Sequence, residues 1–282
     1  MMKIFLVIAT ALVLITPLSA CGQEATTQEI IDGVIQSLSD INTYHCDMDM
    51  SMNMAGEGGG ETVDVSMDMK LNAVIDLENA KMKANITMNT SDPDEGDREM
   101  AMEMYIIGEI TYMMMDIPLL GPMWVKAPMP AGYYQTMGQV KPQVDLLETA
   151  QIELLGSETV NGIDCYLLKV TPDIELLWKL ALQQMESPSN GAAFTIDEEL
   201  LSDMLRSYSV KQWFAKDTYF LAKADISLSL VITPDSMGFA EEEEGSITMD
   251  ITMTMLSYNY NQPVTIELPQ EAAEATEFPM GL

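Results

Sequence analysis

The chain has 282 residues, with 13 Lys and Arg against 44 Asp and Glu, so its formal net charge is −31 at pH 7. This balance disfavours nucleic acid as a partner, because phosphates are bound by Lys and Arg, and it disfavours broad contact with anionic lipid head groups. About 260 residues beyond an N-terminal leader suffice for one large β-rich domain or two small ones.

The first 22 residues have the pattern of a lipoprotein export signal. Lys3 is followed by an apolar run from Ile4 to Ile15 and then by the sequence Leu18–Gly22, which contains small residues just before a cysteine. Small residues admit a signal peptidase, and the thiol of Cys21 can carry a diacylglyceryl group. We therefore expect a signal peptide over residues 1–20 and lipidation of Cys21.

Two other interpretations of this leader remain open. It could be an ordinary secretory peptide cut near Ala20, with Cys21 incidental, or a retained transmembrane helix, although its apolar run is shorter than the roughly 20 residues that a bilayer requires. The two or three acyl chains of a bacterial lipoprotein bind a membrane stably. The leader thus predicts a protein on the extracytoplasmic face of the cell membrane, joined to its lipid anchor by a short tether, residues 21–25.

The first element that we expect after the tether is an amphipathic helix. Thr26 or Thr27 can cap it, Glu29 lies in its first turn, and apolar residues from Ile30 to Leu38 recur at spacings of one, three and four. Such a stripe predicts a helix that packs on a larger apolar surface.

Strand alternation dominates the rest of the chain, and methionine marks it. From Tyr44 to Met54 the even positions are apolar and the odd positions are polar, and the pattern recurs after the glycine turn at 58–60. Period-two alternation of this length is typical of half-buried antiparallel strands. We expect about eleven strands, at 44–54, 63–71, 80–90, 100–106, 109–116, 122–127, 151–159, 162–171, 208–216, 226–232 and 247–255.

Two further helical regions interrupt the strands. One lies within 133–149, started or broken by Pro142, and the other covers 172–182 and resumes at 197–206. Their apolar content favours packing against the sheet. The expected fold is α+β: a curved antiparallel sheet, or half-barrel, with helices packed on its concave apolar face.

Cys46 and Cys165 remain once Cys21 is acylated. An oxidising compartment permits a disulfide between them, but both also fall at inward positions of strands, where they could be separate buried thiols. Sequence cannot decide, because a bridge needs Cα atoms within about 7 Å.

The order of elements, together with two local stretches, resembles the LolA/LolB and LppX/LprG-like lipoprotein superfamily. The stretch from Val210 to Lys223 is similar to the hairpin in which a Trp strand enters an acidic turn, and Tyr258 to Pro269 is similar to the terminal strand and exit. The resemblance implies one domain over 26–269, an acidic tail over 270–282, and a cavity between sheet and helices that accepts acyl chains. It also implies a role in carrying or holding lipids or lipoproteins. The lipid anchor places this chain nearer a membrane-bound receptor than a shuttle.

Methionine is far more frequent here than that resemblance implies. Flexible thioethers tolerate varied apolar guests, so the strand stripes are candidates to line a hydrophobic cavity. The candidates are Met48, Met50, Met67, Met69, Met102 and Met104. The alternative is that these side chains fill a core, in which case the protein is a structural or interaction lipoprotein.

Metal binding is a further hypothesis, and a less favoured one. Thioethers ligate Cu(I), but alternate residues of a strand such as Met48 and Met50 lie roughly 6.6 to 7 Å apart, too far to share an ion unless adjacent strands contribute. The acidic stretch from Asp92 to Asp97 does not have the spacing of an EF-hand and is expected to be a solvated turn. We therefore assign neither a metal nor another cofactor.

Enzyme chemistry finds little support. His45 is the sole histidine and falls on the polar side of its strand, and the sequence has no glycine-rich phosphate loop or paired-histidine zinc motif. We expect a non-enzymatic protein, and the sequence indicates no particular protein partner.

Overall fold

The structure is a computed structural model of the chain. It describes residues 25–58, 61–93, 96–117, 121–129, 144, 147–173, 204–233 and 245–277. The expected signal peptide and Cys21 lie outside these residues.

Helix α1, Thr27–Leu38, begins at the predicted capping site. The side chain of Thr26 accepts a hydrogen bond from the Glu29 backbone N–H, and the Glu29 carboxylate accepts one from the Thr26 N–H at 2.8 Å. This reciprocal capping box satisfies backbone donors that a helix start otherwise leaves free. The pKa of Glu29 is lowered because its carboxylate accepts hydrogen bonds from both the backbone N–H and the hydroxyl of Thr26.

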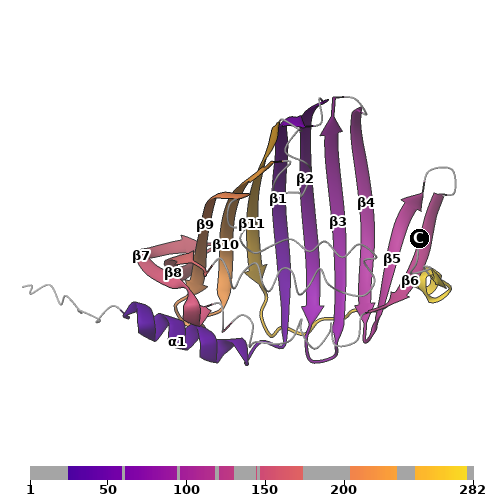
Figure 1. Ribbon diagram of the computed structural model, residues 1–282. Coiled ribbons are helices and arrows are strands. Elements are labelled where there is room, and N and C mark those ends of the chain that lie inside the picture. The colour runs from indigo at the N-terminus through magenta and orange to yellow at the C-terminus, as the bar shows by residue number, and fades with distance from the viewer. Residues whose placement is uncertain are drawn as a thin grey trace, which may run out of the picture.

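A single 12-stranded sheet forms the body of the protein (Figure 1). Its strands are β1 Thr43–Gly58, β2 Glu61–Asp76, β3 Lys81–Asp92, β4 Gly96–Ile107, β5 Ile110–Ile117, β6 Gly121–Pro128, β7 Gln151–Val160, β8 Ile163–Thr171, β9 Leu205–Ala215, β10 Leu221–Ile232, β11 Ser246–Tyr258 and β12 Thr276–Glu277. The first eleven correspond one by one to the strands predicted from alternation.

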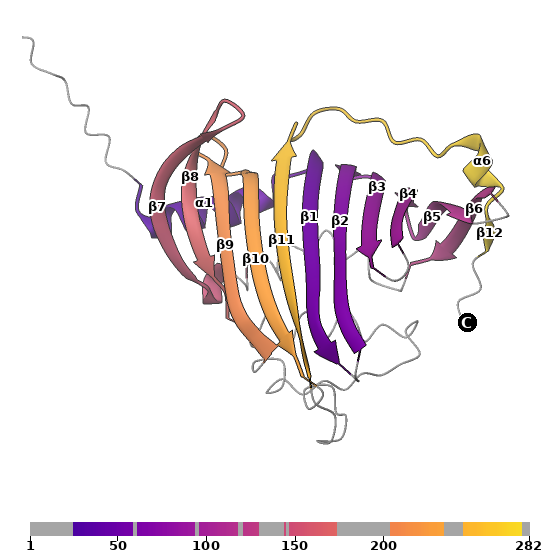
Figure 2. The same cartoon turned by 90° about the horizontal axis from the view of Figure 1, so that it is seen from above.

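The sheet grows in two directions from β1. Strands β1 to β6 form a meander to one side, while β7 to β11 form another that returns to the centre, so that β11 pairs with β1. Within these eleven strands every neighbouring pair is antiparallel. The sheet is open and curved (Figure 2), which agrees with the predicted half-barrel.

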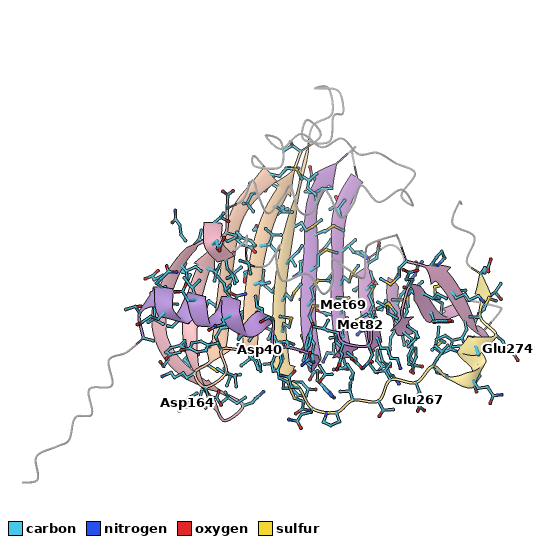
Figure 3. All side chains as sticks on the ribbon, turned by 90° about the horizontal axis from the view of Figure 1, so that it is seen from below. Asp40, Met69, Met82, Asp164, Glu267 and Glu274 are labelled. Carbon is cyan, nitrogen blue, oxygen red and sulfur yellow. The ribbon has the colours of Figure 1, made fainter. Side chains whose placement is uncertain are left out.

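Helix α1 lies across one end of the sheet, over β7 to β10 (Figure 3). The apolar stripe of the helix is buried there together with residues of β8 and β9. The buried members of this cluster are Ile30, Val34, Leu168, Val170, Val210 and Phe214. Helix α1 therefore packs on the sheet as its sequence predicts.

The other predicted helical regions fall largely outside the described residues. Residues 147–149 are helical, and Leu147 packs against the α1 cluster. The end of the last region was wrong, since Leu205 and Arg206 begin strand β9. Leu205 pairs with Leu230 of β10, and Arg206 lies at the irregularity between this pair and the next, Ser207 with Ser229. Tertiary pairing here overrides a local helical pattern.

The chain after β11 crosses the lower ends of the central strands in Figure 1, and we call residues 259–269 the C-terminal strap. The Asn261 N–H donates to the Thr43 carbonyl at 2.8 Å, and the Thr43 hydroxyl donates to the Gln262 carbonyl at 2.7 Å. Beyond it, α6, Gln270–Ala273, packs against β5 and β6, and β12 pairs with β6 in parallel. The segment expected as a tail from residue 270 therefore contributes to the sheet.

Gly33 provides a test of how closely α1 packs. A Cβ at this position would lie 2.8 Å from ring carbons of Tyr219, and that ring stacks on Tyr166 with centroids 6.2 Å apart. We expect Gly33→Ala to lower the free energy of unfolding by about 1 to 3 kcal/mol through overpacking, although the same change in an open helix is stabilising by up to about 1 kcal/mol. Thermal and urea unfolding followed by circular dichroism measures this, with exposed Gln36→Ala as the control. A stabilised Gly33→Ala would contradict the close packing.

Candidate functional site

Alternate residues of neighbouring strands share one side of the sheet, which we call the apolar face. Met255 of β11 lies opposite Met48 of β1, which lies opposite Leu71 of β2. The facing residues of β3 and β4, and of β10 beyond β11, continue this alternation, so their apolar positions lie on the same side of the sheet. From β10 to β4 the apolar face includes Ala224, Ile226, Leu228, Leu230, Met249, Ile251, Met253, Met255, Cys46, Met48, Met50, Met52, Met54, Val65, Met67, Met69, Leu71, Ala73, Met82, Ala84, Ile86, Met88, Met100, Met102 and Met104.

The register also aligns methionines across strands. Five of them lie directly opposite one another on five successive strands, and we call this set the methionine row. Its members, from β11 through β1, β2 and β3 to β4, are Met253, Met50, Met69, Met88 and Met100. Met52 and Met67 form a further facing pair one step along the strands.

The six predicted cavity residues all lie on the apolar face, and all six are half-buried. Met50 and Met69 face each other directly, and Met48 and Met67 flank them. Met102 and Met104 lie on β4, opposite Ile86 and Ala84 of β3, so one strand separates them from the others. The structure thus brings four of the six together and places the remaining two on the same face.

Sequence reasoning did not select three members of the methionine row, namely Met88, Met100 and Met253. Each belongs to a strand with clear alternation, so the side of the sheet was predictable. The position of each methionine relative to Met50 and Met69 depends on strand order and register. Neither is encoded in the alternation of a single strand.

Exposure changes along the apolar face. At the end nearest the C-terminal strap, a cluster of small residues is buried, with Cys46 at 8% and Ala84 at 0% exposure. Met82, Met104 and Met255 pack against this cluster. One or two steps further along the strands the methionine row is half-buried, and Met100 at its β4 end is 52% exposed. The face is thus buried near the C-terminal strap, half-buried along the methionine row and exposed at Met100 on β4.

The opposite side of the central sheet is polar. Asp47 accepts hydrogen bonds from Asn72 at 2.8 Å and from Tyr258 at 3.1 Å, and Ser51 donates to Asp68 at 2.7 Å. His45 packs against Tyr258 with ring centroids 5.4 Å apart on this side. The central sheet is therefore amphipathic, with carboxylates on one side and thioethers on the other.

Two aromatic clusters interrupt the polar side, one on β7, β9 and β10 and the other on β3 and β4. The Trp213 indole donates to Glu158 at 2.8 Å, and the Lys223 ammonium lies 4.5 Å from the Trp213 ring centroid. In the other, Lys83 contacts Glu103 at 2.9 Å and lies over the ring of Tyr105. Their polar groups bond one another, so these clusters stabilise the sheet.

The pKa shifts in the second cluster follow from this pairing. The pKa of Lys83 is raised, mainly because its ammonium bonds the Tyr105 hydroxyl and the Glu103 carboxylate. Burial on its own raises the pKa of Glu103, but hydrogen bonds from Lys83 and Tyr105 lower it overall. Both groups are therefore held in their charged forms.

Within the described part of the chain, no group of three or more His, Cys, Asp or Glu side chains is arranged to hold a metal ion. Asp94 and Glu95 of the acidic turn lie outside that part. None of the helices in the described part of the chain has the length and apolar character needed to span a bilayer.

The two cysteines are free thiols in different clusters. Cys46 lies on the apolar face in β1, whereas Cys165 of β8 is buried with Trp213 and Leu167 on the other side. Strands β11, β10 and β9 lie between them, so they are four strand spacings of roughly 4.8 Å apart as well as on opposite sides. Of the two alternatives from sequence, the structure contains the separate buried thiols.

Thiol titration tests this arrangement. Without reductant, the unfolded chain from Gly22 onward is expected to show two reactive thiols, Cys46 and Cys165. In the folded protein at pH 8 both should react roughly tenfold or more slowly, because burial raises the pKa of each thiol and so lowers its thiolate fraction. A thiol count of zero before reduction would indicate a disulfide instead.

Comparisons with known proteins give a family and a set of similar structures. Residues 26–277 match the model of a family described as a family of unknown function, DUF6612. A search of curated proteins found no match.

Three of the similar solved structures are bacterial. LprF from Mycobacterium bovis is 11% identical, with 86% of this chain and 96% of that chain covered and a TM-score of 0.43. The lipoprotein LppX from Mycobacterium tuberculosis is 13% identical, with coverage of 86% and 100% and a TM-score of 0.39. A putative outer membrane lipoprotein-sorting protein domain from Vibrio parahaemolyticus is 12% identical, with coverage of 83% and 93% and a TM-score of 0.25. These structures include LppX, which the sequence resemblance named.

Proposed function

This chain belongs to the DUF6612 family of unknown function, and we propose that it is a membrane-anchored extracytoplasmic lipoprotein that binds the acyl chains of a lipid on the apolar face of its sheet. The observation that carries the proposal is the partial burial of the side chains at the centre of that face. The facing residues Met50 and Met69 are half-buried, and neither is packed away in a closed core.

The extent and chemistry of the face support an apolar ligand. Large apolar surfaces that stay accessible to water are costly, and in soluble proteins they mark sites for ligands or partners. Unbranched thioether side chains adapt to guests of different shape, which suits acyl chains of varied length. The buried cluster around Cys46 and Ala84 supplies a floor, and the exposed Met100 on β4 marks an entrance.

The leader supports a fixed position at the membrane. Four residues, Gly22 to Ala25, lie between the acylated cysteine and Thr26, the capping residue of α1, so five residue steps join the two. Even fully extended they span at most about 17 Å, so the domain stays close to the bilayer surface. A short tether suits a receptor or holder of lipid better than a carrier that diffuses between membranes.

Charge supports one orientation of this domain. The polar side of the central strands carries Asp47, Asp49 and Asp68, and the whole chain has a formal charge of −31. Anionic head groups repel such a surface. The polar side should therefore face away from an anionic bilayer, with the apolar face turned towards it or towards a bound lipid.

Acidic substitution on the apolar face tests ligand binding. We expect Met50→Asp with Met69→Asp to abolish uptake of a fluorescent fatty acid by the chain from Gly22 onward, because two carboxylates in a facing pair prevent desolvation by the acyl chain. An added probe is needed because Trp213 and Trp124 both lie on the other side of the sheet.

The matched control is Asn53→Asp with Ser66→Asp, which adds the same charges to a facing pair on the same two strands but on the polar side. It should bind the probe as the unmodified protein does. Circular dichroism melts of both variants separate binding from folding. Unfolding of the Met variant at ordinary temperature, or no probe uptake by the unmodified protein, would favour the rival function, a structural lipoprotein with a filled core.

Substitution of the lipidated cysteine tests the anchor separately. In cells, Cys21→Ser is expected to remove incorporation of labelled palmitate and to prevent processing at this site, whereas Cys46→Ser should leave both unchanged. Labelling and membrane fractionation measure the two effects. Equal palmitate incorporation in Cys21→Ser and the unmodified protein would contradict the anchor at this residue.

A further inference from the structure

The methionine row offers a second kind of chemistry beyond apolar contact. We propose that it is a binding site for a soft monovalent cation, Cu(I) or its analogue Ag(I), held by the thioethers of Met50, Met69 and Met88. These three residues lie directly opposite one another on β1, β2 and β3.

The register removes the geometric objection that the sequence raises against such a site. Successive methionines on one strand are separated by roughly 6.6 to 7 Å, which is too far for them to share an ion. Directly facing residues on adjacent antiparallel strands have Cβ atoms about 4.5 to 5.5 Å apart. With three rotatable bonds each, the side chains of Met50 and Met88 can lean towards Met69 from either side.

The donor set selects the metal class. Thioether sulfur is a soft, uncharged donor that favours Cu(I), while carboxylate and water ligands suit Mg²⁺, Ca²⁺ and Mn²⁺. An uncharged donor set also suits a half-buried apolar surface, because no ligand charge has to be desolvated. The formal charge of −31 raises the local concentration of cations around the protein.

Access and packing are consistent with a site rather than a plain core. Met100 continues the row to β4 and is 52% exposed, so an ion can enter from that end. Packing alone does not require methionine in facing positions of successive strands, because Leu, Ile and Val fill sheet surfaces with fewer rotamers to restrain.

The thiols have to be separated from the thioethers in any test. Cys46 lies on the same face, two residues before Met48, and Cys165 is buried on the other side. Thiolates bind Cu(I) and Ag(I) strongly. The reference protein is therefore the full-length chain carrying Cys46→Ala and Cys165→Ala, purified from membranes in detergent without metal.

The experiment measures Ag(I) binding by titration calorimetry and Cu(I) binding by anaerobic competition with bicinchoninate. The row variant adds Met69→Leu and Met88→Leu to the reference, which removes two thioethers while nearly preserving side-chain volume. The control variant adds Met82→Leu and Met114→Leu, whose cross-strand partners include Ile75 and Glu103 rather than row members. We expect the row variant to bind at least about tenfold more weakly and the control to stay within about twofold.

Three results would overturn the proposal: no Ag(I) or Cu(I) binding by the reference, equal loss in both variants, or full binding by the row variant. If the row variant does not fold, Met50→Leu with Met88→Leu replaces it, with the same expectation, because it also removes two of the three proposed ligands. Leucine keeps the face apolar, so fatty acid uptake should persist when metal binding is lost. Failure of the metal site is thereby distinguishable from failure of lipid binding.

Discussion

The structure depends on the register between β1 and its two neighbours. Successive side chains of a strand point to opposite sides, so a slip of one residue would move every thioether of β1 to the polar side and every aspartate to the apolar face. The observed register sets Met50 against Met69 and Met253, and Asp49 against Lys70 and Thr254. Because the same parity continues into β3, β4 and β10, one alignment at the centre fixes the character of both sides of the sheet.

Much of the fold could be predicted from the sequence, because it is written in local patterns. Alternation located the eleven long strands, and the Thr26 and Glu29 pair located the start of α1. Strand β12 was missed because two residues, Thr276 and Glu277, cannot show a period and their parallel pairing with β6 is purely tertiary. The helical expectation for Leu205 failed for the same reason, since its ladder partner on β10 is distant in the sequence.

The candidate site was predicted in part. Alternation correctly assigned Met48, Met50, Met67, Met69, Met102 and Met104 to one side of the sheet. It could not show that Met88 and Met253 extend the same line, because that requires knowing which strands are neighbours and by how many residues they are offset. The cysteines show the same limit: both were predicted to lie in strands, but the topology places four strand spacings between them.

The C-terminal strap is a covalent connection that limits how far this open sheet can flatten. It leaves β11 at the centre, is held at Thr43 by two hydrogen bonds, and ends in α6 and β12 on the far edge, beside β6 (Figures 1 and 2). A chain segment of fixed contour length thus joins the middle of the arc to its rim, as a chord does. Flattening of the β1 to β6 half stretches that chord, whereas tighter curling slackens it. The strap therefore limits how wide this half of the sheet can open. It thereby also limits the width of any molecule that lies against the methionines.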